Sequence, residues 1–174
     1  PDGLHVEAGN PLLTTLSTQG LFAVQDEASQ LVGAYVAPAP GSRVVDACAA
    51  PGGKTAQLAD ALGGTGVLVA CDARPRRVRL LQSMLRARRL ERVPIVQHDL
   101  LRATPFRTLD AMLVDAPCSG LGTIRRDPDI KWKRTPGDLV EFAERQGRML
   151  DQAAAAIRPG GHLTYSTCSS EPEE

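Results

Sequence analysis

The sequence lacks the features of membrane and secreted proteins. No apolar stretch in its 174 residues approaches the ~18 residues that a membrane-spanning helix needs, and its first residues do not resemble a signal peptide. Four cysteines, at positions 48, 71, 118 and 168, include no Cys-x-x-Cys pair, which argues against a zinc knuckle and a disulfide framework. His5, His98 and His162 form no pattern typical of catalysis. We expect a monomeric cytoplasmic protein with reduced thiols, no metal and no membrane partner.

The chain also has no net charge, but its basic residues are unevenly placed. Of its 20 basic residues 17 are arginine, and eight of these lie between Arg74 and Arg92. A second basic cluster has an aromatic residue, Trp132, within it and consists of Arg125, Arg126, Lys131, Lys133 and Arg134. Basic groups beside an aromatic ring suit contact with phosphates and stacking on bases, so the second cluster favours nucleic-acid contact more than the first. The alternative for both clusters is a solvated surface.

The order of apolar and helical patterns predicts an α/β fold. At 43% hydrophobic residues, the chain is long enough for one domain with a sizeable core. From residue 41 onward, apolar runs alternate with helical patterns, which predicts a doubly wound, mostly parallel, Rossmann-like sheet with helices on both faces. The expected strands are Arg43–Asp46, Gly66–Asp72, Val93–His98, Leu109–Asp115 and His162–Ser166. The expected helices are Gln25–Ala37, Gly53–Leu62, Pro75–Leu90 and Asp138–Ile157, the last ended by Pro159-Gly160-Gly161.

Two segments fall outside this alternation. Residues 1–24 read as an irregular or edge-strand-like connection, so we expect the catalytic domain to span 25–174. Residues 116–136 have no helical period, and a loop of this length usually has a function, here contact with a substrate. The chain begins with proline and stops just after a strand, so we expect part of a longer protein, with the last strands of the sheet beyond its end.

A turn rich in small residues follows the first expected strand. Asp46 ends that strand, and the turn that leads into the next helix consists of Cys48, Ala49, Ala50, Pro51, Gly52, Gly53 and Lys54. The two glycines allow close approach of a ligand to the backbone, and the helix start offers free amide groups. A phosphate-binding P-loop is the alternative, but it needs glycine where Cys48 stands, and Pro51 has no amide hydrogen.

Acidic residues follow the next strands. Asp72 stands 20 residues after Gly52, the spacing at which a carboxylate typically binds ribose hydroxyls, and Asp99 follows the third strand. Asp115 ends the fourth strand. Each acid alone could cap the next helix, but together they converge on one crevice and predict a cofactor that contains adenosine.

Two cysteines follow the fourth and fifth strands. Cys118 lies in Asp115-Ala116-Pro117-Cys118, where enzymes that methylate exocyclic amines carry an aromatic residue, and Cys168 lies in Thr167-Cys168-Ser169. Carbon 6 of cytosine must be attacked by a thiolate before carbon 5 can accept a methyl group. The alternative for each thiol is a small buried side chain, which is the better reading for Cys71.

These segments together resemble the Sun/Nol/Nop family of RNA (cytosine-5)-methyltransferases. The similar segments are residues 46–55 (DACAAPGGKT), 115–120 (DAPCSG), 125–132 (RRDPDIKW) and 167–174 (TCSSEPEE). The third segment is most similar to the bacterial Sun/Fmu branch, which methylates small-subunit ribosomal RNA. The resemblance implies S-adenosylmethionine as cofactor and structured RNA as partner. It also implies an N-terminal RNA-binding domain, which we do not find in this chain.

The resemblance implies a role for each site residue. Cys168 would attack carbon 6, and Cys118 would help to remove the carbon 5 proton and release the enzyme. Asp115 would act on ring nitrogen 3, if burial favours its protonated form. Lys54 would position Asp115 or lower the pKa of a thiol, and Arg77 would lie near the cofactor.

Other functions remain open at this level. An inactive methyltransferase-like RNA-binding module would not need both thiols, and DNA cytosine methyltransferases carry their nucleophile in the Pro-Cys segment without a second thiol at the later strand end. A transfer RNA target is compatible with the same catalytic residues. In each active case the target base must be flipped out or unpaired to expose carbon 6.

Overall fold

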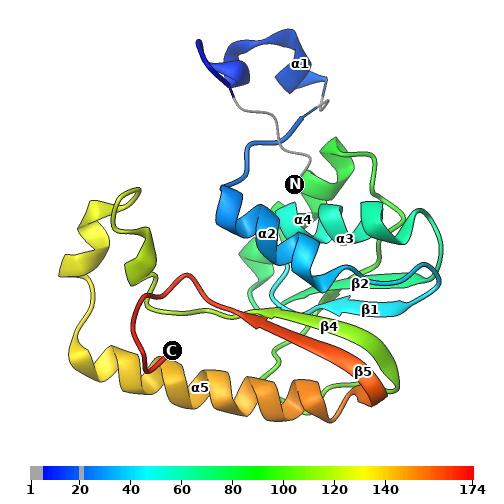
Figure 1. The fold of residues 1–174 in the computed structure, drawn as a ribbon, viewed down its shortest axis with the longest axis vertical. Coiled ribbons are helices and arrows are strands. Elements are labelled where there is room, and N and C mark those ends of the chain that lie inside the picture. Colours follow the sequence, from blue (N-terminus) through cyan, green and yellow to red (C-terminus); the bar gives the residue numbers. More distant parts are fainter. Residues whose placement is uncertain (1–5, 20–21) are drawn as a thin grey trace.

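A five-stranded parallel sheet forms the centre of the protein, in a computed structural model that describes residues 6–19 and 22–174 (Figure 1). The expected strands are all present, in the order β3-β2-β1-β4-β5. Their bounds are β1 Arg43–Asp46, β2 Val67–Asp72, β3 Ile95–Gln97, β4 Leu109–Asp115 and β5 Ile157–Ser166. All four pairings between neighbours are parallel, so the carboxyl ends of the strands lie along one edge of the sheet.

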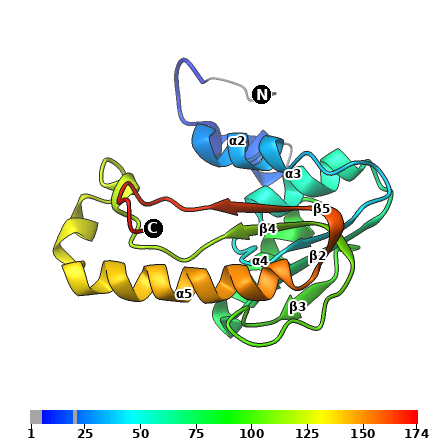
Figure 2. The same ribbon diagram turned by 60° about the horizontal axis from the view of Figure 1, so that its bottom comes forward.

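Helices cover both faces of the sheet, which confirms the predicted doubly wound architecture (Figure 2). The long helices are α2 Glu27–Val36, α3 Gly53–Leu62, α4 Pro75–Ala87 and α5 Pro136–Ala154. Alternate strand residues face opposite sides. On one face Val44 and Leu68 pack with Leu58 of α3, while on the other face Val45 and Met112 pack with α5. Leu81 and Leu85 of α4 also cover the first face, where they pack with Ala70 of β2.

The last helix and strand differ from the prediction. Helix α5 begins at Pro136 because Thr135 and Asp138 form a capping box, with the Thr135 amide 2.7 Å from Asp138 Oδ2. It ends at Ala154 and not at Ile157, and the Pro159-Gly160-Gly161 segment lies inside β5. A Cβ at Gly161 would stand 2.9 Å from the Leu109 carbonyl oxygen, so glycine permits the close approach to β4 where the strand register shifts.

Short helical turns occupy the two segments expected to be irregular. In the N-terminal segment these are η1 Pro11–Leu13 and α1 Thr15–Thr18, and no strand forms among its described residues. Residues 1–5, 20 and 21 of the segment predicted as a connection, including His5, lie outside the described residues. The long connection after β4 contains η2 Leu121–Thr123 and η3 Pro128–Trp132. Within the described ranges, no helix is long and apolar enough to cross a membrane.

Candidate active site

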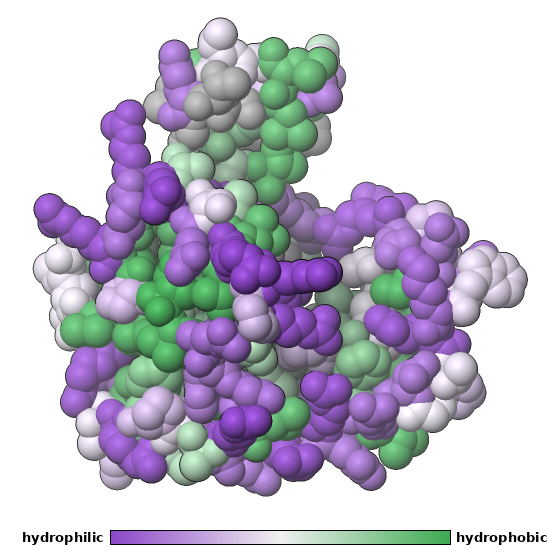
Figure 3. All heavy atoms as spheres, turned by 180° about the vertical axis from the view of Figure 1, so that it is seen from behind, coloured by the Kyte–Doolittle hydropathy of each residue, from purple (hydrophilic) through white to green (hydrophobic). Residues whose placement is uncertain are grey.

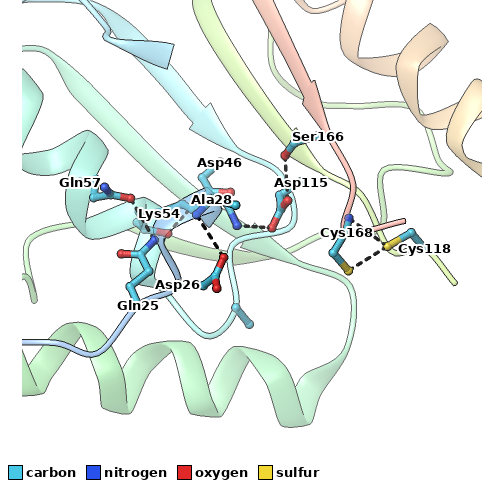
Figure 4. A network of polar contacts seen from close by, with 12 residues as sticks. Gln25, Asp26, Ala28, Asp46, Lys54, Gln57, Asp115, Cys118, Ser166 and Cys168 are labelled. Carbon is cyan, nitrogen blue, oxygen red and sulfur yellow. Dashed lines mark hydrogen bonds and ion pairs between the residues drawn. The ribbon is translucent and has the colours of Figure 1, made fainter. Parts of the chain in front are cut away.

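Functional side chains gather at the carboxyl ends of the central strands (Figure 4). Asp46, Asp72 and Asp115 are the last residues of β1, β2 and β4, as predicted, and Ser166 is the last of β5. Asp99 lies two residues beyond β3, which is shorter than expected, and its Oδ1 accepts a hydrogen bond from the Leu101 amide at 3.0 Å. The structure therefore brings three of the four acids to strand ends and uses Asp99 to stabilise a turn.

The turn after β1 approaches its neighbours closely. Gly52 has φ of 116°, and a Cβ on it would lie 3.0 Å from the Leu81 side chain, so only glycine fits without strain. Gly52 is also the N-cap of α3 and provides no side-chain hydrogen bond, which leaves the first amides of α3 for another acceptor. A pocket of about 150 Å³ opens here, lined by residues 48–51, Gly53 and Lys54 of the turn and by Asp46 and Asp115.

Arg77 connects the end of β2 to this turn. Its Nε lies 2.9 Å from Asp72 Oδ2, and its Nη2 donates to the Ala50 carbonyl oxygen at 2.5 Å. Asp72 is buried, and its Oδ1 accepts from the Arg74 amide at 3.1 Å. The arginine therefore holds the carboxylate and the turn in fixed relative positions at the place where the sequence predicts a cofactor.

Asp46 is a fully buried carboxyl, which its position at a strand end did not reveal. Its Oδ2 accepts from the Thr55 hydroxyl at 2.7 Å, while Oδ1 has no hydrogen-bond partner among the described residues. Burial raises the pKa of Asp46 to about 7, with a further contribution from the negative charge of Asp115. This side chain holds a proton near neutral pH beside the pocket.

Lys54 forms an ion pair with Asp115. The ammonium Nζ lies 2.7 Å from Asp115 Oδ2, and the Ser166 hydroxyl donates to Oδ1 at 2.8 Å. The Asp115 side chain is 32% exposed, so its burial is less complete than expected from the sequence. Asp115 thus has fixed orientation between α3 and β5, with one-third of its surface open.

The thiols of Cys118 and Cys168, 50 residues apart in sequence, lie 3.1 Å apart (Figure 4). The Cys168 amide also donates to Cys118 Sγ at 3.3 Å. These bonds lower the pKa of Cys118 to about 7, with the Cys168 thiol as the largest cause. The same contact, together with partial burial, raises the pKa of Cys168. The contact therefore couples the ionisation of the two thiols and favours the thiolate at Cys118 over that at Cys168. Cys168 is the more exposed of the two.

A partly buried polar network joins the segments behind the thiols. Gln146 of α5 donates through Nε2 to the Pro117 carbonyl oxygen and to Glu174 Oε1, both at 3.0 Å, and accepts from the Tyr165 hydroxyl at 2.9 Å. The Ser119 amide also donates to Glu174 Oε1 at 2.8 Å. The network joins the segments that carry the two thiols, and sequence reasoning missed it because its members have no local pattern.

The other cysteines have structural positions. Cys71 is buried in β2, and burial raises its pKa to about 12. Cys48 is half-buried in the turn, and burial together with the charges of Asp46 and Asp72 raises its pKa. Among the described residues, no group of three or more His, Cys, Asp or Glu could hold a metal ion.

A solved structure places this fold in a known class. NSun6 from Pyrococcus horikoshii, solved with the S-adenosylmethionine analogue SFG, superposes with a TM-score of 0.87 at 28% identity, over 95% of this chain and 43% of that one. The protein therefore has the Rossmann-like fold of S-adenosylmethionine-dependent methyltransferases, which confirms the predicted fold and cofactor.

The sequence comparison is more specific. The family model of the 16S rRNA methyltransferase RsmB/F matches residues 34–174, so the chain belongs to this family and the resemblance found in its motifs is confirmed.

Two curated relatives show how much of the family's length the chain contains. The probable ribosomal RNA small subunit methyltransferase B of Synechocystis is 35% identical over the whole of this chain. The ribosomal RNA small subunit methyltransferase B of Pseudomonas putida is 40% identical over 90% of it. The chain spans 40% and 36% of the length of these two proteins.

Proposed function

We propose that this chain is the catalytic domain of an S-adenosylmethionine-dependent methyltransferase that acts on carbon 5 of cytosine in small-subunit ribosomal RNA. The observation that carries the proposal is the pair of thiols 3.1 Å apart, beside the carboxylate of Asp115 and next to the cofactor turn. A single buried cysteine would need no such partner. Two thiols and a carboxylate suit a reaction that adds a nucleophile to a ring and later removes a proton.

The residues around the turn fit the cofactor. The amides at the start of α3, which Gly52 leaves without a side-chain cap, suit its polar and charged groups, and the carboxylate of Asp72 suits ribose hydroxyls. The remaining members of this binding set are Cys48, Ala49, Ala50, Pro51, Lys54, Arg77, Asp99 and Asp115. When bound, S-adenosylmethionine supplies a methyl group on a positively charged sulfur.

Covalent attack on the base begins with a proton transfer between the thiols. Cys168 gives its proton to the Cys118 thiolate, which releases it to solvent, and the Cys168 sulfur forms a bond to carbon 6. Electron density then shifts to carbon 5, which would accept the methyl group as the bond from that group to the positively charged sulfur breaks and leaves a neutral thioether. Asp115, held by Lys54 and Ser166, transfers a proton to nitrogen 3 of the ring as the bond to carbon 6 forms and takes it back when that bond breaks.

Release of the product frees the Cys168 sulfur as a thiolate and leaves the proton from carbon 5 on Cys118. Cys118 removes the proton from carbon 5, the double bond between carbons 5 and 6 forms again, and the bond from carbon 6 to Cys168 breaks. The pKa of Cys118 near 7 suits a group that must accept and release protons at neutral pH. The same value favours one alternative, in which Cys118 is itself the nucleophile.

The experiment that tests this function is tritium release. Small-subunit ribosomal RNA transcribed with tritium at carbon 5 of cytosine is mixed with the protein and S-adenosylmethionine. Methyl transfer to carbon 5 must release tritium to water, whereas methylation of an exocyclic amine or of a ribose hydroxyl leaves it in the RNA. Methyl incorporation without tritium release would refute the proposed position.

Two controls define the substrate. Transfer RNA transcripts labelled in the same way test the alternative target, and release from transfer RNA alone would replace ribosomal RNA as the substrate. If no RNA accepts a methyl group although the cofactor binds, an inactive RNA-binding module is the correct description.

A further inference from the structure

The segment from the start of η2 to Arg134 forms a lobe that is hydrogen-bonded to the segments that carry the two thiols. We call residues 121–134 the η2–η3 lobe. The Gly122 amide donates to the Cys168 carbonyl oxygen at 3.0 Å, and Arg134 Nε donates to the Ser119 carbonyl oxygen at 2.7 Å. Ile130 is buried against Gly120, where a Cβ would stand 2.6 Å from its Cδ1. Anything bound to this lobe is therefore held at a fixed position relative to Cys168.

The lobe stands beside the end of β5 and the start of α5 (Figure 1). Figure 3, which shows the molecule from behind, has mainly hydrophilic side chains over this part of the surface. The apolar underside of the lobe, with Ile130, thus packs on the protein while its outer surface faces solvent.

Only some of the basic residues of the lobe are free to bind a ligand. Arg126 Nη1 forms an ion pair with Asp26 at 3.0 Å, and Arg134 both binds Ser119 and lies over the ring of Phe142 at 5.3 Å. The remaining cations, which are exposed and form no ion pair among the described residues, are Arg125, Lys131 and Lys133.

The acidic residues of the lobe reduce its charge without cancelling it. Asp127 and Asp129 are exposed on the same segment, so five basic residues stand against two acidic ones. The free cations therefore define a locally basic surface in a chain that has no net charge.

Trp132 lies among these cations with 80% of its surface exposed. The Lys131 ammonium is 4.9 Å from the centre of its ring, a cation–π distance, and the ring does not pack into the core. An exposed indole beside free cations combines a stacking surface with phosphate-binding groups, which is how proteins bind single-stranded nucleic acid.

We propose that the η2–η3 lobe binds the single-stranded RNA next to the target cytosine, with Trp132 stacked on an unpaired base and Arg125, Lys131 and Lys133 in contact with phosphates. This inference rests on the proposed function, because a target cytosine at Cys168 requires its neighbouring nucleotides to pass the lobe. A single strand fits better than a duplex, since stacking on Trp132 needs a base with a free face.

The test uses the intrinsic fluorescence of Trp132, which is the only tryptophan in the sequence. The protein is titrated with a short single-stranded RNA, with the same RNA paired in a duplex, and with inorganic polyphosphate. Stacking of a base should quench the fluorescence with the single strand, whereas the duplex and polyphosphate should leave it nearly unchanged. Single-stranded RNA that binds without changing the fluorescence would overturn the proposal.

Variants separate stacking from charge. Trp132→Ala should bind the single strand roughly tenfold or more weakly, and Trp132→Phe should recover part of this loss because it restores a ring. Lys133→Ala should reduce the slope of log K against log salt concentration by about 0.7. Tyr35→Ala is the matched control, since Tyr35 is also 80% exposed but lies on α2. Equal affinities of Trp132→Ala and wild type would contradict the stacking role.

These titrations involve no methyl transfer, so they distinguish the two proposals. Quenching without tritium release from any RNA would leave the lobe as a binding surface and refute the proposed function. Tritium release by wild type, with unchanged RNA affinity in Trp132→Ala, would support the proposed function and refute the stacking role of the lobe.

Discussion

Replacing Asp46 by asparagine should remove a pH-dependent loss of stability. The pKa of Asp46 rises from 3.8 to about 7 in the folded protein, because the carboxyl is buried. Between these two values the folded state keeps a proton that the unfolded state has lost, so the contribution of this group to stability falls as pH rises through that window. Three pKa units correspond to about 4 kcal/mol, as an upper estimate, lost by neutral pH and above.

The assay is urea unfolding of wild type and Asp46→Asn at about pH 4 and about pH 8. The amide has no charge to bury and can still accept from Thr55. The free energy of unfolding of the variant relative to wild type should therefore be higher at pH 8 than at pH 4, by up to about 4 kcal/mol. Glu91→Gln, which removes one exposed carboxyl, controls for the change in net charge. A difference between Asp46→Asn and wild type that is the same at both pH values would refute the reasoning.

Three further predictions concern the network, the thiols and the core. Gln146→Leu should destabilise the protein by on the order of 1–3 kcal/mol in urea unfolding, because it removes the three hydrogen bonds of a buried amide, and should slow adduct formation more than RNA binding; unchanged stability would contradict the network. Alkylation of Cys118 by iodoacetamide should rise with pH through about 7, and Cys168→Ala should move this midpoint upward towards 9 because the main hydrogen-bond donor is lost; an unmoved midpoint would exclude that cause. Leu58→Ala, in the core, should cost about 2–5 kcal/mol of unfolding free energy, whereas the exposed Leu13→Ala should cost at most about 0.5; equal costs would contradict the assigned packing.

Much of the fold could be predicted because its signals are local. The strands Arg43–Asp46 and Leu109–Asp115 have the predicted bounds, since strands covered on both faces read as continuous apolar runs. Helix α3 also begins and ends as predicted, at residues set by glycines. The predicted start of β5 was wrong, because Pro159-Gly160-Gly161 looks like a segment that ends a helix. In the structure this segment is part of the strand, and Gly161 is needed for close contact with β4, about 50 residues away in sequence.

The site shows the same division between local and distant signals. The acids at strand ends could be placed from the sequence, because parallel strands bring their carboxyl ends to one edge. The roles of Cys118 and Cys168 were inferred from family resemblance, and the contact between the two thiols was not predicted. The burial of Asp46 and the hydrogen bonds of Gln146 depend on distant segments, so no pattern within the sequence could predict them.

The central claim is that Cys168 forms the covalent bond to cytosine while Cys118 handles protons. The most direct test is trapping with RNA that contains 5-fluorocytosine, in which the adduct cannot lose fluorine from carbon 5 and therefore survives denaturation. Wild type and Cys118→Ala should form this adduct in the presence of S-adenosylmethionine, and Cys168→Ala should not. An adduct that persists in Cys168→Ala and disappears in Cys118→Ala would reverse the two roles and contradict the account.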